Sequence, residues 1–153
     1  MITGHSSEPG GLSRAEIDAL FLSNFEAWHA GRYREVVREH FHPEARLIYS
    51  GAGTFPLFSG THVGHDRIIE ATRRLLETFE AMRAHIHDVV VEKNRVSVHS
   101  SVCLRHYVSR RVAETEICDR YVLDRSGRIV EWVAYSDTGL MSHLCDGLDP
   151  SWD

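Results

Sequence analysis

The sequence lacks several features that would assign it to a specialised class of protein. No run of about 18 apolar residues occurs, so we expect no membrane-spanning helix and no membrane partner. The N-terminus, MITGHSSEPGGLS, lacks the basic and then apolar segments of a signal peptide. Internal repeats and low-complexity tracts are absent as well. We therefore expect the 153 residues to form one globular domain that is large enough to bury a core.

The chain has too few basic residues for a typical nucleic-acid-binding protein and too few cysteines for a disulfide framework. The formal net charge of −5 argues against a nucleic-acid-binding protein, because phosphate contacts require a basic face. Cys103, Cys118 and Cys145 are an odd number of cysteines and form no CxxC motif. A disulfide framework is therefore not expected, and the cysteine pattern predicts a reducing, cytoplasmic location.

Apolar residues at helical spacing predict three helices in the first half of the chain. Ser13 and Glu16 in SRAE form a capping box that begins the first helix, and Gly31 is suited to end it. YREVVREHF predicts a short second helix, a short strand is predicted at 45–50, and a long helix from about 65 to 83. Before the long helix, the loop GAGTFPLFSGTHVG carries apolar residues. This loop is either a flap over a cavity or a segment packed on the core.

Beyond residue 84 the apolar residues alternate with polar ones, which predicts β-strands. We expect four of them, at about 85–92, 95–108, 113–124 and 128–136. The connections KN, RR and DRSG are short enough for hairpins, so the strands should form an antiparallel meander. A short helix from about 138 to 145 follows. This order of elements predicts an α+β fold in which three helices cover one face of a curved sheet.

Asp119 is unusual because it lies on a strand face that is otherwise apolar. Two-residue hairpin turns would place Asp119 opposite Val102 and Trp132, and Val102 opposite His85. All four residues would then point to the face that meets the helices. A carboxylate there indicates a pocket, where desolvation raises its pKa towards the range that acid–base catalysis requires. A structural aspartate, satisfied by neighbouring polar groups, is the alternative.

Two further pairs of side chains bear on whether the protein binds a metal and whether it forms a dimer. His85 and His87 in HIH share a face, as two metal ligands would, but no third ligand with matching spacing is evident. We therefore expect no metal, with one of these histidines lining the pocket. Cys103 and Cys118 are expected opposite one another on the outer face of the sheet, which also carries Val133 and Tyr135 and predicts a homodimer interface.

Three stretches of the sequence carry a family resemblance. They are AGRYREVVREHFHPEARL, GHDRIIEATRRLL, and the segment that runs from Asp119 through DRSGRI to AYSD. Together with the order of elements they resemble the nuclear transport factor 2-like superfold, in particular its SnoaL-like polyketide cyclase and ketosteroid isomerase branch. The resemblance covers about residues 13–145 and implies a cone-shaped sheet around an apolar pocket. This superfold hosts isomerases, cyclases, dehydratases, hydrolases and non-catalytic binders.

The resemblance also implies roles for individual residues. Asp119 falls on the oxyanion-hole aspartate of ketosteroid isomerases, and on the strand where SnoaL-like cyclases carry an acid/base aspartate. The general base and the oxyanion-hole tyrosine of the isomerases fall on Tyr49 and about Asn24, so two of three isomerase groups are changed. His106 is the nearest counterpart of the histidine that assists the cyclases, and His85 is a second candidate.

These observations predict a cofactor-independent enzyme that transfers protons on a hydrophobic, oxygenated small molecule by cyclisation, isomerisation or dehydration. The alternative is a module of the same fold that binds a small molecule or a partner without turnover. The predicted regions are a flexible lead-in at 1–12, the domain at 13–145 and a tail at 146–153. The predicted catalytic residues are Asp119, His106, His85 and Tyr49. The predicted substrate-binding residues are Asn24, Trp28, Phe79, Ser100, Val102, Tyr121 and Trp132.

Overall fold

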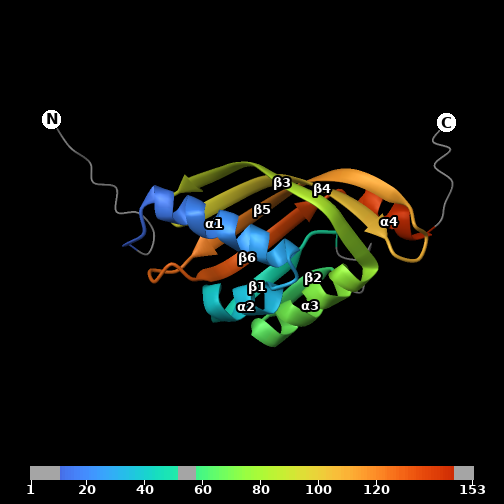
Figure 1. The fold of residues 1–153 in the computed structure, drawn as a ribbon. Coiled ribbons are helices and arrows are strands. Elements are labelled where there is room, and N and C mark those ends of the chain that lie inside the picture. The colour runs from blue at the N-terminus through green and yellow to red at the C-terminus, as the bar shows by residue number, and fades with distance from the viewer. Residues whose placement is uncertain (1–10, 52–57, 147–153) are drawn as a thin grey trace.

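The computed structural model of the protein describes residues 11–51 and 58–146, which form four helices and one six-stranded sheet (Figure 1). The helices are α1 (Arg14–His29), α2 (Tyr33–His40), α3 (His65–Thr78) and α4 (Thr138–Asp146). The strands are β1 (Phe41–Tyr49), β2 (Gly60–Val63), β3 (Phe79–Glu92), β4 (Arg95–His106), β5 (Val112–Leu123) and β6 (Ile129–Ser136). The predicted α+β class is confirmed. The predicted lead-in and tail, and the middle of the predicted flap, lie largely outside the described residues.

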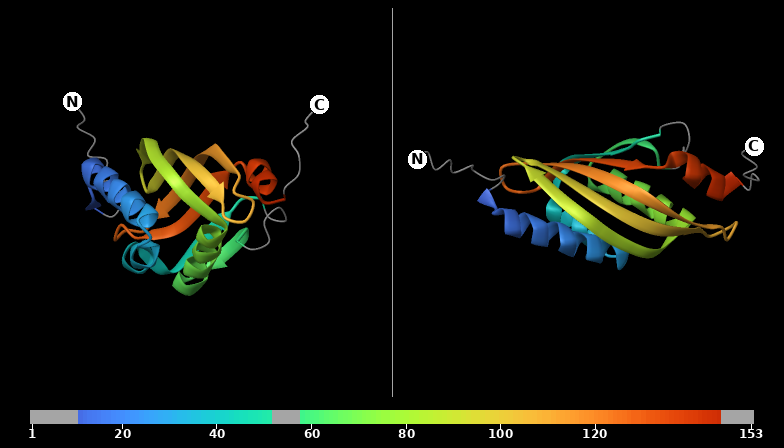
Figure 2. Two further views of the ribbon diagram at one scale, coloured as in Figure 1. Left: turned by 45° about the vertical axis from the view of Figure 1, so that its right-hand side comes forward. Right: turned by 90° about the horizontal axis from the view of Figure 1, so that it is seen from above.

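The strands lie in the order β2-β1-β6-β5-β4-β3. The predicted antiparallel meander is confirmed for β3 to β6, and β1 extends the sheet by pairing parallel to β6. The sheet is curved, and α1, α2 and α3 lie together against its concave face (Figure 1). Figure 2 shows α4 at the opposite end of the strands from the start of α1. Helices therefore enclose the hollow of the sheet along its face and at one end.

The first helix begins and ends as the sequence predicts. The Ser13 backbone N–H donates to Glu16 Oε2 at 2.7 Å, and the Glu16 N–H donates to Ser13 Oγ at 3.2 Å, which is the predicted capping box. Gly31 follows the last turn with a φ of 84°, a left-handed conformation that glycine adopts without strain. Ile17 and Phe21 anchor the helix in the core.

The third helix is shorter than predicted, because β3 begins at Phe79 and not near residue 85. The segment FEAMRA has good helix formers, which favoured a continued helix from sequence. Its backbone instead pairs with β4, where Phe79 lies opposite His106, and the Phe79 side chain is buried. Pairing along a full-length neighbouring strand outweighs the small intrinsic helix preference of these residues. The strand β2 is a second difference, since the sequence predicted only loop there.

The predicted pairing of His85 with Val102 is wrong because β3 contains a β-bulge. The turn after Glu92 is as predicted, but the register shifts between Ile86 and Asp88 and leaves one extra residue in β3. An insertion of one residue moves the side chains before it to the opposite face. A second register shift, between Ala81 and Arg83, returns Phe79 and Ala81 to the concave face. His85 therefore lies opposite Ser101 on the outer face, and Ala84 takes the place opposite Val102.

The predicted turn at RR is also wrong, because the loop between β4 and β5 is longer than two residues. Arg105 pairs with Val112, so Asp119 lies opposite Val98 and not opposite Val102. A displacement of four residues is even, and an even displacement leaves each side chain on its predicted face. Asp119 therefore still points to the concave face.

The pairing of β5 with β6 differs from the prediction by two residues. Asp119 lies opposite Ala134, and Trp132 lies opposite Tyr121. The displacement is again even, so all of these side chains keep the concave face. Trp132 becomes a diagonal neighbour of Asp119 and stays within reach of its carboxyl group.

The predicted pairing of Cys103 with Cys118 is also wrong, because the register between β4 and β5 is displaced by four residues. Cys103 lies opposite Glu114 and is buried, whereas Cys118 lies opposite His99 and is exposed. Neither thiol forms a disulfide. The two cysteines therefore do not mark one patch on the outer face.

Candidate active site

A cavity lies between the concave face of the sheet and the helices. The space open to the centres of water-sized molecules is about 140 Å³, roughly ten times the space that a single buried water needs. All four helices and the strands β1 and β3 to β6 contribute to its walls, and most of the lining side chains are apolar. A hydrophobic molecule with a few polar atoms matches such a cavity.

The cavity brings together most of the residues that the sequence singled out. Two predicted catalytic residues line it, Asp119 and Tyr49. All of the predicted substrate-binding residues line it as well, namely Asn24, Trp28, Phe79, Ser100, Val102, Tyr121 and Trp132. His85 and His106 are not among the lining residues.

Asp119 is the single carboxyl group among the described residues that line the cavity. Its Oδ1 accepts a hydrogen bond of 2.8 Å from the indole N–H of Trp132. Burial raises the pKa of the Asp119 carboxyl to about 7, while the hydrogen bond from Trp132 acts in the opposite direction because it favours the charged form. Near neutral pH this carboxyl can therefore either hold a proton or accept one.

Two phenols face the same space as Asp119. Tyr49 on β1 and Asp119 on β5 both pair with Ala134 on β6, which places the two side chains in one row across the sheet. Tyr121 stacks on Trp132 with ring centroids 5.7 Å apart. Burial and the nearby charge of Asp119 raise the pKa of both Tyr49 and Tyr121 well above the usual range. Both phenols therefore stay protonated and remain hydrogen-bond donors.

Helix α1 adds two polar groups to the cavity wall. The Nδ2 group of Asn24 is buried and has no hydrogen-bond partner among the described residues, so it is a donor in need of an acceptor. His29, an exposed residue at the end of the helix, also lines the cavity, where its ring lies 4.4 Å from that of Phe25 and desolvation lowers its pKa. Sequence reasoning missed His29. Its position four residues after Phe25, on the same side of the helix, was the available signal.

The two predicted assisting histidines lie far from Asp119. His106 is eight residues along β4 from Val98, the residue opposite Asp119, which corresponds to about 26 Å along the strand. It is buried, and its Nδ1 accepts a hydrogen bond of 3.1 Å from the backbone N–H of Ser109, so it holds the loop after β4. His85 is exposed on the outer face because of the bulge in β3.

The family model of the SnoaL-like domain matches residues 23–132, which is most of the chain. The protein belongs to the SnoaL-like domain family. The matched segment runs from α1 to Trp132 in β6, so it contains Asp119 together with its hydrogen-bond donor. The resemblance seen in the sequence is thereby confirmed. None of the curated protein sequences compared with this SnoaL-like domain matches it.

Solved structures share the fold of this SnoaL-like domain. An NTF2-like protein of unknown function from Burkholderia pseudomallei K96243 matches with a TM-score of 0.76 and 22% identity, covering 85% of this chain and 97% of that chain. A candidate SnoaL-like polyketide cyclase from Jannaschia sp. CCS1 matches with a TM-score of 0.75 and 19% identity, over 90% and 98% of the two chains. TerC, co-crystallised with polyporic acid, has a TM-score of 0.72 and 17% identity, over 84% and 96%. At these identities the likeness shows the fold alone, and the predicted NTF2-like cone is confirmed.

The helices that the structure describes are 8 to 16 residues long. Within the described part of the chain, none combines the length and the apolar content that a membrane span requires.

Proposed function

We propose that the protein is an acid–base enzyme that transfers a proton next to a carbonyl group of a small hydrophobic molecule. Asp119 carries the proton, and cyclisation, isomerisation or dehydration are the reactions that such a transfer starts. The observation that supports this most directly is that, among the described residues, one carboxyl group lies in the apolar cavity and has a pKa of about 7. A general base is most effective when its pKa lies near the working pH.

The mechanism needs a carboxylate that can take a proton and groups that stabilise the resulting oxyanion. Asp119 in its charged form would remove a proton from the carbon beside the carbonyl, and would return the proton to another atom of the same molecule. The indole N–H of Trp132 keeps the carboxyl group oriented between these steps. No cofactor is required, because the carbonyl group itself accepts the electron pair.

Neutral donors around the cavity suit the oxyanion. Asn24 offers an N–H group without a partner among the described residues, and the phenols of Tyr49 and Tyr121 stay protonated. Donors that are already in place stabilise developing negative charge more effectively in a dry cavity than in water. We assign the carbonyl oxygen of the substrate to these donors, and its apolar part to the aromatic walls formed by Trp28 and Phe79.

We infer the chemical class of the substrate from the cavity, with support from similar structures. The few polar groups suit a molecule with one or two oxygens on an apolar skeleton. The similar Jannaschia protein is described as a candidate polyketide cyclase, and TerC was crystallised with polyporic acid. We therefore assign a substrate of polyketide, steroid or terpenoid type.

A binding module without turnover is the second candidate function. It is favoured by one observation, namely that neither His85 nor His106 lies at the cavity to assist Asp119. The two functions differ in one measurable property, the exchange of protons beside a carbonyl group. We expect the protein to catalyse deuterium exchange into small apolar ketones in D₂O, followed by proton NMR. The contrary result is that ketones quench the fluorescence of the cavity tryptophans, which reports binding, without exchanging deuterium faster than the uncatalysed rate. That result would favour the binding module.

We further infer that two copies of the chain associate through the outer face of the sheet. Tyr135 is exposed there, near the alternating charges of Arg46, Glu131 and Arg120, whose ion pairs have N–O distances of 2.6 and 3.6 Å. Val112 is exposed on the same face at the start of β5. A face that exposes apolar groups together with both signs of charge offers groups that a second copy of the same face, related by a twofold axis, could pair with.

The homodimer makes a direct prediction for light scattering at micromolar concentration. The wild-type chain should give twice the mass of 17.4 kDa, and Tyr135→Glu should give the mass of one chain, because it buries a charge at the interface. Tyr107→Glu is the matched control, since Tyr107 and Tyr135 are each 45% exposed and Tyr107 lies on the loop after β4. A monomeric wild type, or an equal effect of both variants, would contradict this interface.

A further inference from the structure

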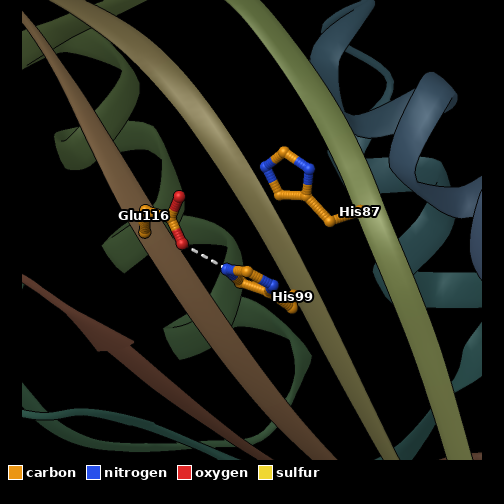
Figure 3. Close-up of side chains that lie close together, drawn as sticks. All are labelled: His87, His99 and Glu116. Atoms are coloured by element: carbon orange, nitrogen blue, oxygen red, sulfur yellow. Dashed lines mark hydrogen bonds and ion pairs between the residues drawn. The ribbon is translucent and has the colours of Figure 1, made fainter.

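A cluster of metal-ligand side chains lies on the outer face of the sheet, on the side opposite the cavity. His87 comes from β3, His99 from β4 and Glu116 from β5. Figure 3 shows the three side chains on neighbouring strands with the helices behind the sheet, on its other face. The proposed acid–base chemistry uses none of these groups, so the cluster calls for a separate explanation.

The three donors are close enough to bind one ion. One ligand atom from each of His87, His99 and Glu116 lies within 4.8 Å of the others. Two ligands of the same zinc ion are at most about 4.2 Å apart, because each lies about 2.1 Å from the metal. Nε2 of His99 already contacts Oε2 of Glu116. A modest rotation of the exposed His87 side chain is therefore sufficient to close the site.

The bulge in β3 is what adds His87 to this face. In a β-bulge two residues of one strand oppose a single residue of the partner strand. The shift between Ile86 and Asp88 leaves His87 as the extra residue, and Asp88 lies opposite His99. The ring centroids of His87 and His99 are consequently only 4.9 Å apart. Sequence spacing within HIH could not show this, because the second and third ligands come from two other strands.

Asp88 completes the arrangement that metal-binding histidines commonly have. Its Oδ2 lies 3.4 Å from Nδ1 of His99. A carboxylate on one ring nitrogen orients the imidazole and leaves the other nitrogen for the ion. In His99 that other nitrogen, Nε2, is the one that faces Glu116.

We propose that His87, His99 and Glu116 bind one divalent first-row transition-metal ion, such as Zn²⁺. Two imidazoles and a carboxylate suit Zn²⁺, Cu²⁺ or Ni²⁺ better than Mg²⁺ or Ca²⁺, which prefer sites made of oxygen ligands. Three protein ligands leave a coordination position for water or another ligand.

The ion would tie together three strands that also form the cavity wall. Val98, Ser100 and Ile117 are sequence neighbours of the ligands, point to the opposite face and line the cavity. The metal site is therefore outside the cavity, and it would stabilise the edge of the sheet at β3. This proposal does not depend on whether Asp119 is catalytic.

Isothermal titration of the full-length protein with Zn²⁺, in a buffer that does not chelate metals, tests the site. We expect one ion per chain, and His87→Gln, His99→Gln and Glu116→Gln should each weaken binding by more than about tenfold. Zn²⁺ should also raise the melting temperature of the wild type but not of these variants. Their melting temperatures without metal should stay close to that of the wild type, because His87 and Glu116 are exposed and the half-buried His99 makes only solvent-accessible ion pairs.

Three control variants separate this site from other modes of metal binding. His40→Gln removes a histidine that lies 3.8 Å from the carboxylate of Glu39, and it should leave Zn²⁺ affinity unchanged. Cys118→Ser should also leave affinity unchanged, as should Tyr135→Glu, which leaves each chain with its own ligands. The proposal is overturned if the wild type shows no saturable binding, if His40→Gln and His99→Gln weaken binding equally, or if Cys118→Ser or Tyr135→Glu abolishes it.

Discussion

Asp119→Asn should lower the rate of deuterium exchange into small apolar ketones by roughly 10²–10⁴-fold, the usual contribution of one general acid or base. The amide keeps the shape of the carboxyl group, and its oxygen can still accept the hydrogen bond from Trp132. It cannot take up a proton near neutral pH. Binding of the same ketones should persist, and it can be followed by quenching of the fluorescence of Trp28 and Trp132, which line the cavity.

The matched control for this experiment is Asp66→Asn. Asp66 lies in the first turn of α3, and its side chain is 92% exposed, so the control makes the same chemical change outside the cavity. Exchange should be unaffected in the control. If Asp119→Asn retains the wild-type rate, or if it abolishes ketone binding together with exchange, Asp119 is not the group that transfers the proton.

Asp119→Asn should also stabilise the folded protein above neutral pH, by on the order of 4 kcal/mol. The folded pKa of Asp119 is raised to about 7 from a usual value of 3.8. Between these two pH values the unfolded chain has released the proton while the folded chain still holds it. Stability therefore falls as pH rises through this window and levels off above pH 7. The asparagine variant never ionises, so it avoids this loss.

Urea denaturation at about pH 4 and pH 8 measures the difference in free energy of unfolding between the wild type and Asp119→Asn. The wild type and Asp119→Asn should have similar free energies of unfolding at the lower pH, where the folded carboxyl group is neutral and the unfolded one is only about half ionised. At the higher pH the variant should be the more stable protein. Asp66→Asn should show no comparable gain, because its carboxyl group is solvated. A variant that is less stable than the wild type at pH 8 would instead identify Asp119 as a structural ion with satisfied hydrogen bonds.

The face of each strand could be predicted from sequence more reliably than its register. Asp119 and Trp132 were assigned to the concave face by alternation, and they lie there although both hairpin registers are displaced. Displacements of four and two residues preserve the face because side chains alternate with a period of two. The predicted cavity position of Asp119 therefore did not depend on the turns.

The histidines show what sequence alone could not provide. His85 was lost from the predicted site because a single inserted residue in β3 reverses the face, and nothing in HIH indicates a bulge. His106 was displaced from Asp119 because the apolar residues after it read as strand, whereas they form a loop. His29 was overlooked because it follows the apolar stripe of α1 at the very end of the helix. Each error concerns the end of a helix or strand or the register of a strand pair. Contacts between distant segments of the chain decide both.

The most direct test of the central claim is a carbon NMR titration of the Asp119 carboxyl in protein labelled with [4-¹³C]aspartate, with Asp119→Asn used to assign the resonance. In an apolar cavity beside Trp132 the carboxyl group should titrate with a midpoint near pH 7. Binding of an apolar ketone, which displaces water from the cavity, should move the midpoint further upward. A midpoint near pH 4, unchanged by the ketone, would show a solvated carboxylate and would contradict a proton-transfer role for Asp119.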